Sequence, residues 1–392
     1  MDDFETEEQE EQREQPRKRH RLRRFLLFTL ILLAVLAAVV LAAYRDGTGF
    51  DALRRYFSYG SVEKSGGTEE YAYDASSDNR FAVLGDSLVV LSNAQLKIFG
   101  GSGETVYSAD VAMEAPALAV GGGCAVAYDV GGTQMIVVDE KGERGRLTAA
   151  EDEPYLAASL NDKGWLAVTA EKKNYKGCVS VYSDKMELVF AFNSSERFVT
   201  DAWVTDDCKS LTAVTLGQKD SRFLSSLVFY DLDATEPRAS CDVEDGLVLA
   251  MGEKDGKIAA VSDTGLTLAT YAGEIAASYG YSGGYLREYD LGGDGYTALL
   301  LNRYQSGSAG TLVTVGPDGK KLASLDVKEE ILSLSAAGRY LAVLYADRLV
   351  IYNQDLEEYA RLSGTDYARS VLMRADGSAL LLSSEKATLF LP

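Results

Sequence analysis

The sequence predicts an all-β fold built from a repeated unit, and three observations indicate it. A turn followed by a short apolar run recurs eight times after residue 80, at a mean spacing of about 41 residues. No long stretch after residue 57 places apolar residues at helical spacing, and the chain holds only 6 prolines. The apolar runs are short and rich in Val, Leu and Tyr, as β-strands are. A spacing near 41 residues is typical of the four-stranded blades of a β-propeller.

The repeated element marks the second strand of each blade. Its copies begin near residues 85, 121, 161, 206, 253, 292, 336 and 374, and they read GDSLVVLS, GGGCAVAYD, NDKGWLAVTA, DDCKSLTAVTL, EKDGKIAAVSD, GGDGYTALLLN, AAGRYLAVLYA and RADGSALLLSS. An apolar pair and a turn follow each copy, as in QLKIFGGSGE and LVIYNQDLE, and predict a third strand with a hairpin. Runs such as FVTDAWV predict first strands, and runs such as KKLASLDV predict fourth strands. Asp-Gly steps, for example Asp255–Gly256, supply turn residues for the hairpins.

The two ends of the repeat region predict how the ring closes. The last copy has three strands, SVLM, SALLLSS and KATLFLP, and no fourth. The earlier phrase TEEYAYDAS, residues 68–76, resembles the fourth-strand phrase LEEYARLSG at 356–364. We therefore expect the N-terminal strand to complete the last blade, which pairs two sheet edges that would otherwise stay open. Residues 68–392 are predicted to form eight blades, or seven if the second or fifth copy is misread.

The segment Phe25–Ala43 predicts a transmembrane helix. Among its nineteen residues only Thr29 is polar, and about that length crosses the hydrocarbon core of a bilayer. A cleaved signal peptide is the alternative, because Ala42 and Ala43 are small enough for processing. The apolar run is longer than the usual h-region of a signal peptide, which favours the anchor.

The charges beside this span predict its direction. Six Lys and Arg residues lie within 17–24, whereas only Arg45 follows the span closely. The positive-inside rule therefore predicts a single-pass cell-membrane protein with a cytoplasmic N-terminus and an extracellular C-terminal domain. Residues 1–24, acidic and then basic, are predicted to be a disordered tail. Residues 44–67 are predicted to be a juxtamembrane tether.

Charge and residue usage exclude several kinds of chemistry. The formal net charge of −20 argues against nucleic-acid binding, because an acidic surface repels phosphates. The only histidine, His20, lies in the basic flank, so the predicted propeller has no imidazole for a catalytic triad or a metal ligand. The four cysteines lack CxxC spacing, which argues against zinc. We expect no cofactor and no metal, and we interpret Asp206–Asp207 and Glu244–Asp245 as hairpin turns rather than calcium ligands.

The layout resembles a family of membrane proteins of Gram-positive bacteria whose function is unknown. The resemblance rests on the order of the parts (tail, span and degenerate propeller) and on strand phrases such as NDKGWLAVTA and AAGRYLAVLYA. The resemblance implies a membrane-anchored propeller, and it identifies no catalytic residues. The Gly-His and Trp-Asp pairs of WD repeats and the tryptophan pattern of quinoprotein propellers are absent from the sequence.

Three long connections between second and third strands predict a binding face. They read EKKNYKGC, GQKDSRFLSS and NRYQSGSAG, and propeller topology places them on one face together with the connections between blades. Their basic and aromatic residues contrast with the acidic chain, so we expect a ligand to contact Lys172, Lys173, Tyr175, Lys176, Lys219, Arg222, Phe223, Arg303 and Tyr304. The tyrosine-rich stretch 279–296, with Tyr281 and Tyr285, is a second candidate on this face. The simpler alternatives are soluble insertions for the loops and ordinary strand residues for the tyrosines.

These observations favour a non-enzymatic binding or scaffolding platform for an envelope protein or a cell-wall polymer. The alternative is a carboxylate-dependent glycosidase or lyase, which needs two carboxylates about 5–9.5 Å apart at the central channel. A sensor that passes an outside event to the acidic tail is a third hypothesis, and the single span argues against it.

Overall fold

The computed structural model describes residues 26–36, 51, 70–76, 78–219, 221–243 and 246–392. The chain divides into two units, Met1–Gly60 and Ser61–Pro392, and every described strand belongs to the second. In the first unit, residues 26–36 form a helix. Within the described residues, no helix is both long enough and apolar enough to cross a bilayer. The rest of the predicted span, the predicted tail and all of the tether except Asp51 lie outside the described residues.

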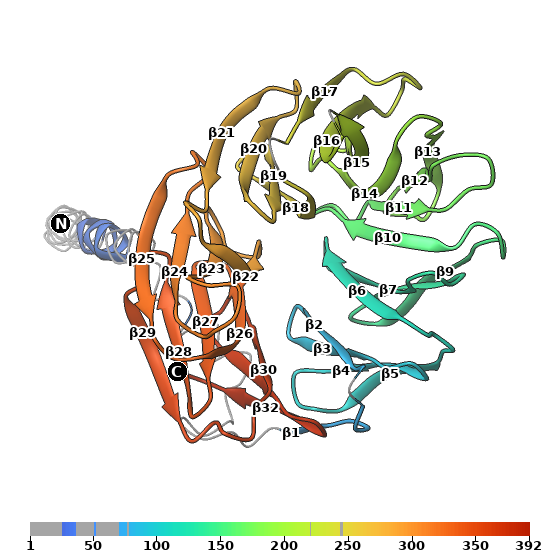
Figure 1. The fold of residues 1–392 in the computed structure, drawn as a ribbon. Helices are drawn as coiled ribbons and strands as arrows, with labels where there is room; N and C mark the ends of the chain where they lie inside the picture. The colour runs from blue at the N-terminus through green and yellow to red at the C-terminus, as the bar shows by residue number, and fades with distance from the viewer. Residues whose placement is uncertain (1–25, 37–50, 52–69, 77, 220, 244–245) are drawn as a thin grey trace, which may run out of the picture. The chain divides into compact units, whose positions relative to one another are not determined.

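The described strands form eight antiparallel sheets of four strands each, arranged around a common axis (Figure 1). This confirms the prediction of an all-β, eight-bladed propeller, and it excludes the seven-bladed alternative. Each predicted copy forms the second strand of its own blade. The second and fifth copies, which were the doubtful ones, form β7 and β19 like the others.

Each blade has an innermost, a second, a third and an outer strand. The innermost strands are β2 (Arg80–Leu84), β6 (Pro116–Gly121), β10 (Tyr155–Leu160), β14 (Phe198–Val204), β18 (Val248–Lys254), β22 (Tyr285–Asp290), β26 (Ile331–Ala337) and β30 (Ser370–Met373). The second strands are β3 (Ser87–Leu91), β7 (Cys124–Asp129), β11 (Leu166–Ala170), β15 (Ser210–Lys219), β19 (Lys257–Ser262), β23 (Thr297–Asn302), β27 (Tyr340–Tyr345) and β31 (Ala379–Leu382).

The outer half of each blade completes the sheet. The third strands are β4 (Gln95–Phe99), β8 (Gln134–Asp139), β12 (Cys178–Tyr182), β16 (Arg222–Asp231), β20 (Gly265–Thr270), β24 (Gly310–Val315), β28 (Arg348–Asn353) and β32 (Lys386–Phe390). The outer strands are β5 (Thr105–Asp110), β9 (Gly142–Thr148), β13 (Leu188–Asn193), β17 (Ala239–Asp242), β21 (Ile275–Gly280), β25 (Lys321–Val327), β29 (Glu358–Ser363) and β1 (Glu70–Ala72).

Burial explains why the second strand of each blade could be recognised in the sequence as a repeated apolar run. Every residue of β7, β23 and β27 is buried, whereas every residue of β5, and every residue of β25 except Val327, is exposed or partly buried. A second strand has partners on both edges and a neighbouring blade on both faces, so it reads as a continuous apolar run. One core cluster, for example, joins Leu300 and Leu312 of one blade to Leu341 and Val343 of the next. The core therefore lies between blades and continues around the ring.

The N-terminal strand closes the ring as the sequence predicts. β1 pairs with β32 in the register Glu70↔Thr388, which completes the last blade. Tyr71 is fully buried, and its hydroxyl donates a hydrogen bond to the carbonyl oxygen of Gly101 in the first blade at 2.9 Å. The Lys386 ammonium lies 2.5 Å from the Glu70 carboxylate. β1 thus joins the last blade to the first.

Side chains of the innermost strands bind the backbone of the next blade. Glu288 and Asp290 of β22 accept hydrogen bonds from the backbone amides of Leu334 and Ala336 in β26, at 3.0 and 2.9 Å. Two serines of β26 repeat this arrangement toward β30. An innermost strand has one edge without a strand partner, and these side chains satisfy amides that would otherwise lack an acceptor.

Candidate functional site

The second-to-third connections and the connections between blades lie on one side of the propeller, which we call the loop face. Residues 171–177, between β11 and β12, and residues 303–309, between β23 and β24, are long connections, as predicted. The third predicted loop has a different form: β15 and β16 continue as a hairpin arm up to the pair Lys219↔Arg222. β14 pairs with β15 only as far as Leu216, so this arm extends beyond the rest of its blade.

The structure distributes the predicted site residues over three places on the loop face. Lys172, Lys173, Tyr175 and Lys176 lie together in the connection 171–177. Lys219, Arg222 and Phe223 belong to the hairpin arm, where the Phe223 side chain is 69% exposed. Arg303 and Tyr304 are exposed on the connection 303–309.

The two tyrosines of the second candidate stretch differ in accessibility. Tyr281 is buried, and its hydroxyl donates a hydrogen bond to the carbonyl oxygen of Ser262 at 2.9 Å. Burial raises the pKa of this hydroxyl above its ordinary value. Tyr285 is 49% exposed. Tyr285 is therefore far more accessible to a ligand than Tyr281.

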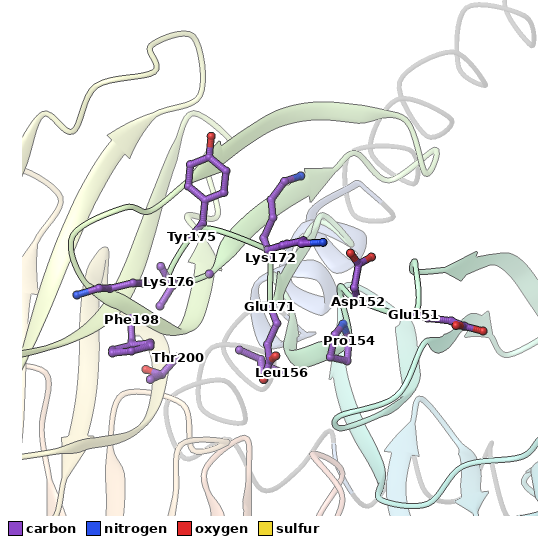
Figure 2. A pocket seen from close by; sticks show the side chains of 13 residues that line it. Glu151, Asp152, Pro154, Leu156, Glu171, Lys172, Tyr175, Lys176, Phe198 and Thr200 are labelled. Carbon is purple, nitrogen blue, oxygen red and sulfur yellow. The ribbon is translucent and has the colours of Figure 1, made fainter.

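The first cavity of the loop face lies between the third and fourth blades and has a volume of about 740 Å³. Figure 2 shows the connection that carries Lys172 and Tyr175 between two walls, with Phe198 on one side and Asp152 on the other. The Lys176 ammonium lies 5.3 Å from the centre of the Phe198 ring, and it also donates a hydrogen bond to the carbonyl oxygen of Glu196 at 2.9 Å. The cavity is therefore built from three separate chain segments.

The first cavity is not purely basic, although the sequence of its loop indicated a basic site. Glu151 and Asp152, from the connection between the second and third blades, line it together with Glu171. Lys172 pairs with Glu153 of the same connection at 3.4 Å. The basic loop is thus balanced by carboxylates of the preceding connection, and the cavity presents both signs of charge.

A feature that sequence reasoning missed is a repeated β-bulge in five consecutive innermost strands. The register of β10, β14, β18, β22 and β26 skips one residue near the loop face. A bulge adds an unpaired residue and re-aims its side chain. The added residues are Leu156, Thr200, Leu249, Arg287 and Leu332. The first four line cavities of the loop face, and Leu332 is 38% exposed.

Two more cavities lie beside the sixth blade, and they share part of their lining. The second, of about 390 Å³, and the third, of about 620 Å³, both contact Arg287, Asn302 and Gln305. Tyr281 and Tyr285 line the third cavity. Arg303 and Tyr304 line none of the three cavities.

Exposed apolar side chains gather on the loop face. Sixteen large apolar side chains of the described propeller residues are exposed, and ten of these lie on this face. The ten are Val130, Tyr175, Phe198, Phe223, Leu247, Leu249, Tyr285, Tyr304, Leu332 and Tyr367. The loop face therefore carries most of the large exposed apolar side chains of the described propeller residues.

Four carboxyl groups of the innermost strands have raised pKa values, those of Asp201, Glu253, Glu288 and Asp290. Burial raises the pKa of Glu288 to about 7 and that of Asp201 to about 6. Burial also raises the pKa of Asp290, against the hydrogen bonds that it accepts from Ala336 and Gly292. The backbone contacts of Glu288 and Asp290 between blades give these two groups a structural role.

The described residues offer no metal centre. They contain no group of three or more His, Cys, Asp or Glu side chains that could hold an ion. All four cysteines are free thiols; Cys124 is buried and the other three are partly exposed.

The fold defines an eight-bladed β-propeller whose loop face carries cavities and exposed apolar side chains. The chain belongs to a family of unknown function, DUF5711, whose family model matches residues 55–386. The comparison with curated proteins found no match.

Solved structures of other propellers are similar to this chain in fold. BamB from Moraxella catarrhalis has 13% identity and a TM-score of 0.53, over 83% of this chain and 99% of that one. The C-terminal WD40 domain of Sif2 has 12% identity and a TM-score of 0.60, over 84% and 100%. NirN, a dihydro-heme d1 dehydrogenase, has 12% identity and a TM-score of 0.50, over 74% and 67%. Since these proteins share a fold but differ in their names and chemistry, function must be argued from the site.

Proposed function

We propose that this chain is a membrane-anchored, non-enzymatic platform whose loop face docks an envelope protein. The observation that carries the proposal is the gathering of exposed apolar side chains on this one face. Apolar side chains that gather on the surface of a soluble domain mark sites of protein interaction. Aromatic residues such as Phe198, Phe223 and Tyr175 are the types that most often anchor a partner.

The charges of the loop face favour a protein over a polyanion. Around the first cavity, Lys172, Lys173 and Lys176 are offset by Glu151, Asp152 and Glu171. A polyanion would meet these carboxylates as well as the net charge of −20. Polar groups of both signs around exposed aromatic side chains are typical of protein interfaces.

The cellular location in this proposal rests on the sequence. The apolar segment Phe25–Ala43 would hold the chain in the cell membrane, and the basic residues before it would keep the N-terminus in the cytoplasm. The propeller would then lie outside the cell membrane, where an envelope protein can reach the loop face.

Photo-crosslinking in living cells tests the proposal. A photoreactive residue would replace Tyr175 or Tyr304 on the loop face, and Lys141, an exposed turn residue between β8 and β9 on the opposite face, would be the control. We expect one specific protein adduct from the loop-face positions and none from Lys141. An adduct with the mass of a wall polymer would replace the protein partner with a polymer. Equal labelling from all three positions, or no specific adduct, would contradict the proposal.

A further inference from the structure

The second cavity of the loop face brings together two side chains of opposite charge. Arg287 of β22 and Glu330, just before β26, line the same cavity of about 390 Å³. Both side chains are exposed. Neither forms a hydrogen bond or an ion pair with any described residue, so their charged atoms are more than 4.0 Å apart. The cavity thus holds a cation and an anion that the fold does not pair with each other.

The bulge in β22 does not need an arginine at position 287. Arg287 is the residue added by the bulge between Leu286 and Glu288. In the four other bulged innermost strands the added residue is Leu or Thr, so the bulge itself needs no charge. The bulge directs this one guanidinium to the loop face, where it lines both the second and the third cavity.

The connection 303–309 forms the remaining wall. The Asn302 side chain is buried, and its Nδ2 donates a hydrogen bond to the carbonyl oxygen of Gly307 at 2.9 Å, which ties the connection down. Gly307 has φ of 130°, a conformation that other residues rarely adopt. Within this tied connection, Gln305 lines both cavities and adds an amide to their walls.

We propose that the second cavity binds a zwitterionic ligand of the amino-acid or short-peptide class, with its carboxylate on Arg287 and its ammonium on Glu330. A simple anion would meet Glu330 and the acidic chain, and a simple cation would meet Arg287. A ligand with both charges gains from both contacts, and a guanidinium binds a carboxylate through two parallel hydrogen bonds. The proposal goes beyond protein docking, because it needs none of the exposed apolar side chains.

Binding of a dipeptide to the full-length, detergent-solubilised chain tests this site. The probes are L-alanyl-L-alanine, its N-acetyl derivative, which lacks the ammonium, and its amide, which lacks the carboxylate; affinity is measured by ligand-detected NMR titration up to 10 mM. We expect the dipeptide to bind at least about tenfold more tightly than either derivative, since a hydrogen bond to a charged group is worth at least that factor.

The variants separate the two contacts. Arg287→Gln should remove the preference for the dipeptide over its amide, and Glu330→Gln should remove the preference over the N-acetyl form. Arg369→Gln and Glu114→Gln are the matched controls, because both residues are exposed on the loop face and line neither the second nor the third cavity. The proposal is overturned if the natural chain does not bind the dipeptide by 10 mM, if it binds the three probes equally, or if both cavity variants keep both preferences. An unchanged melting temperature shows that the variants are folded.

Discussion

The buried carboxyl of Glu288 predicts that replacing it with an amide stabilises the protein at alkaline pH. Burial raises its pKa from the ordinary 4.5 to about 7. The folded state therefore holds the proton more tightly than the unfolded state, and stability falls as the pH rises through the window from 4.5 to 7. A tenfold change in proton affinity is worth about 1.4 kcal/mol, so the ionised carboxylate costs the folded state about 3 kcal/mol at pH 8 and under about 1 kcal/mol at pH 5.

Glu288→Gln removes this cost and keeps an oxygen that can accept the hydrogen bond from the Leu334 amide. Urea denaturation of the natural chain and the variant at pH 5 and pH 8 measures the effect. We expect the unfolding free energy of the variant, relative to that of the natural chain, to be about 2–3 kcal/mol higher at pH 8 than at pH 5. Glu385→Gln, at an exposed turn, is the control and should show no such shift. A variant that is destabilised equally at both pH values would refute the reasoning and would show that Glu288 is ionised in the folded state.

Three further substitutions test the ring, the blade contacts and the loop face. Tyr71→Ala should lower the unfolding free energy by about 3–5 kcal/mol in a thermal melt, because it leaves a cavity where the last blade joins the first. The control, Tyr367→Ala, removes an exposed side chain and should lower it by under about 0.5 kcal/mol. Gly121→Ala should lower the unfolding free energy measured in urea by about 1–3 kcal/mol, because its Cβ would lie 2.3 Å from the Leu160 carbonyl oxygen. Gly280→Ala, whose Cβ would meet no atom within 4 Å, should leave the unfolding free energy unchanged, and equal effects would contradict the packing argument. Phe198→Ala should weaken partner capture at Tyr175 by roughly thirtyfold without changing the melting temperature, and full capture by this variant would remove the first cavity from the interface.

The ring could be predicted from sequence because its signals are local. Each second strand is a short apolar run with a turn before it, so eight copies could be counted without any tertiary information. The closing strand could be predicted because Glu70–Ala72 has the same three residues, Glu-Tyr-Ala, that begin β29. Both strands occupy the outer position of a blade. Both strands carry a tyrosine at the corresponding position: Tyr71 contacts the ring of Phe99 in the first blade, and Tyr359 contacts the ring of Tyr340 in its own blade.

The cavities of the loop face could be predicted only in part, because they combine segments that are distant in the chain. The loop containing Lys172 was found from its length and charge. The carboxylates of Glu151 and Asp152 that balance it lie in the preceding connection, and Phe198 begins the next blade. The bulges could not be predicted either, because one extra residue does not change the composition of a strand. In the sequence alone, Arg287 looks like an ordinary polar strand residue.

The closing strand also determines the order in which the protein can be completed during synthesis. Glu70 leaves the ribosome 316 residues before Lys386, its partner in the last blade. Until then β1 has no native strand partner. Its residues Glu-Tyr-Ala also begin β29, and β28, the strand with which β29 pairs, is synthesised before β32. Faithful assembly therefore requires that β29 pair with β28 before β1 reaches it.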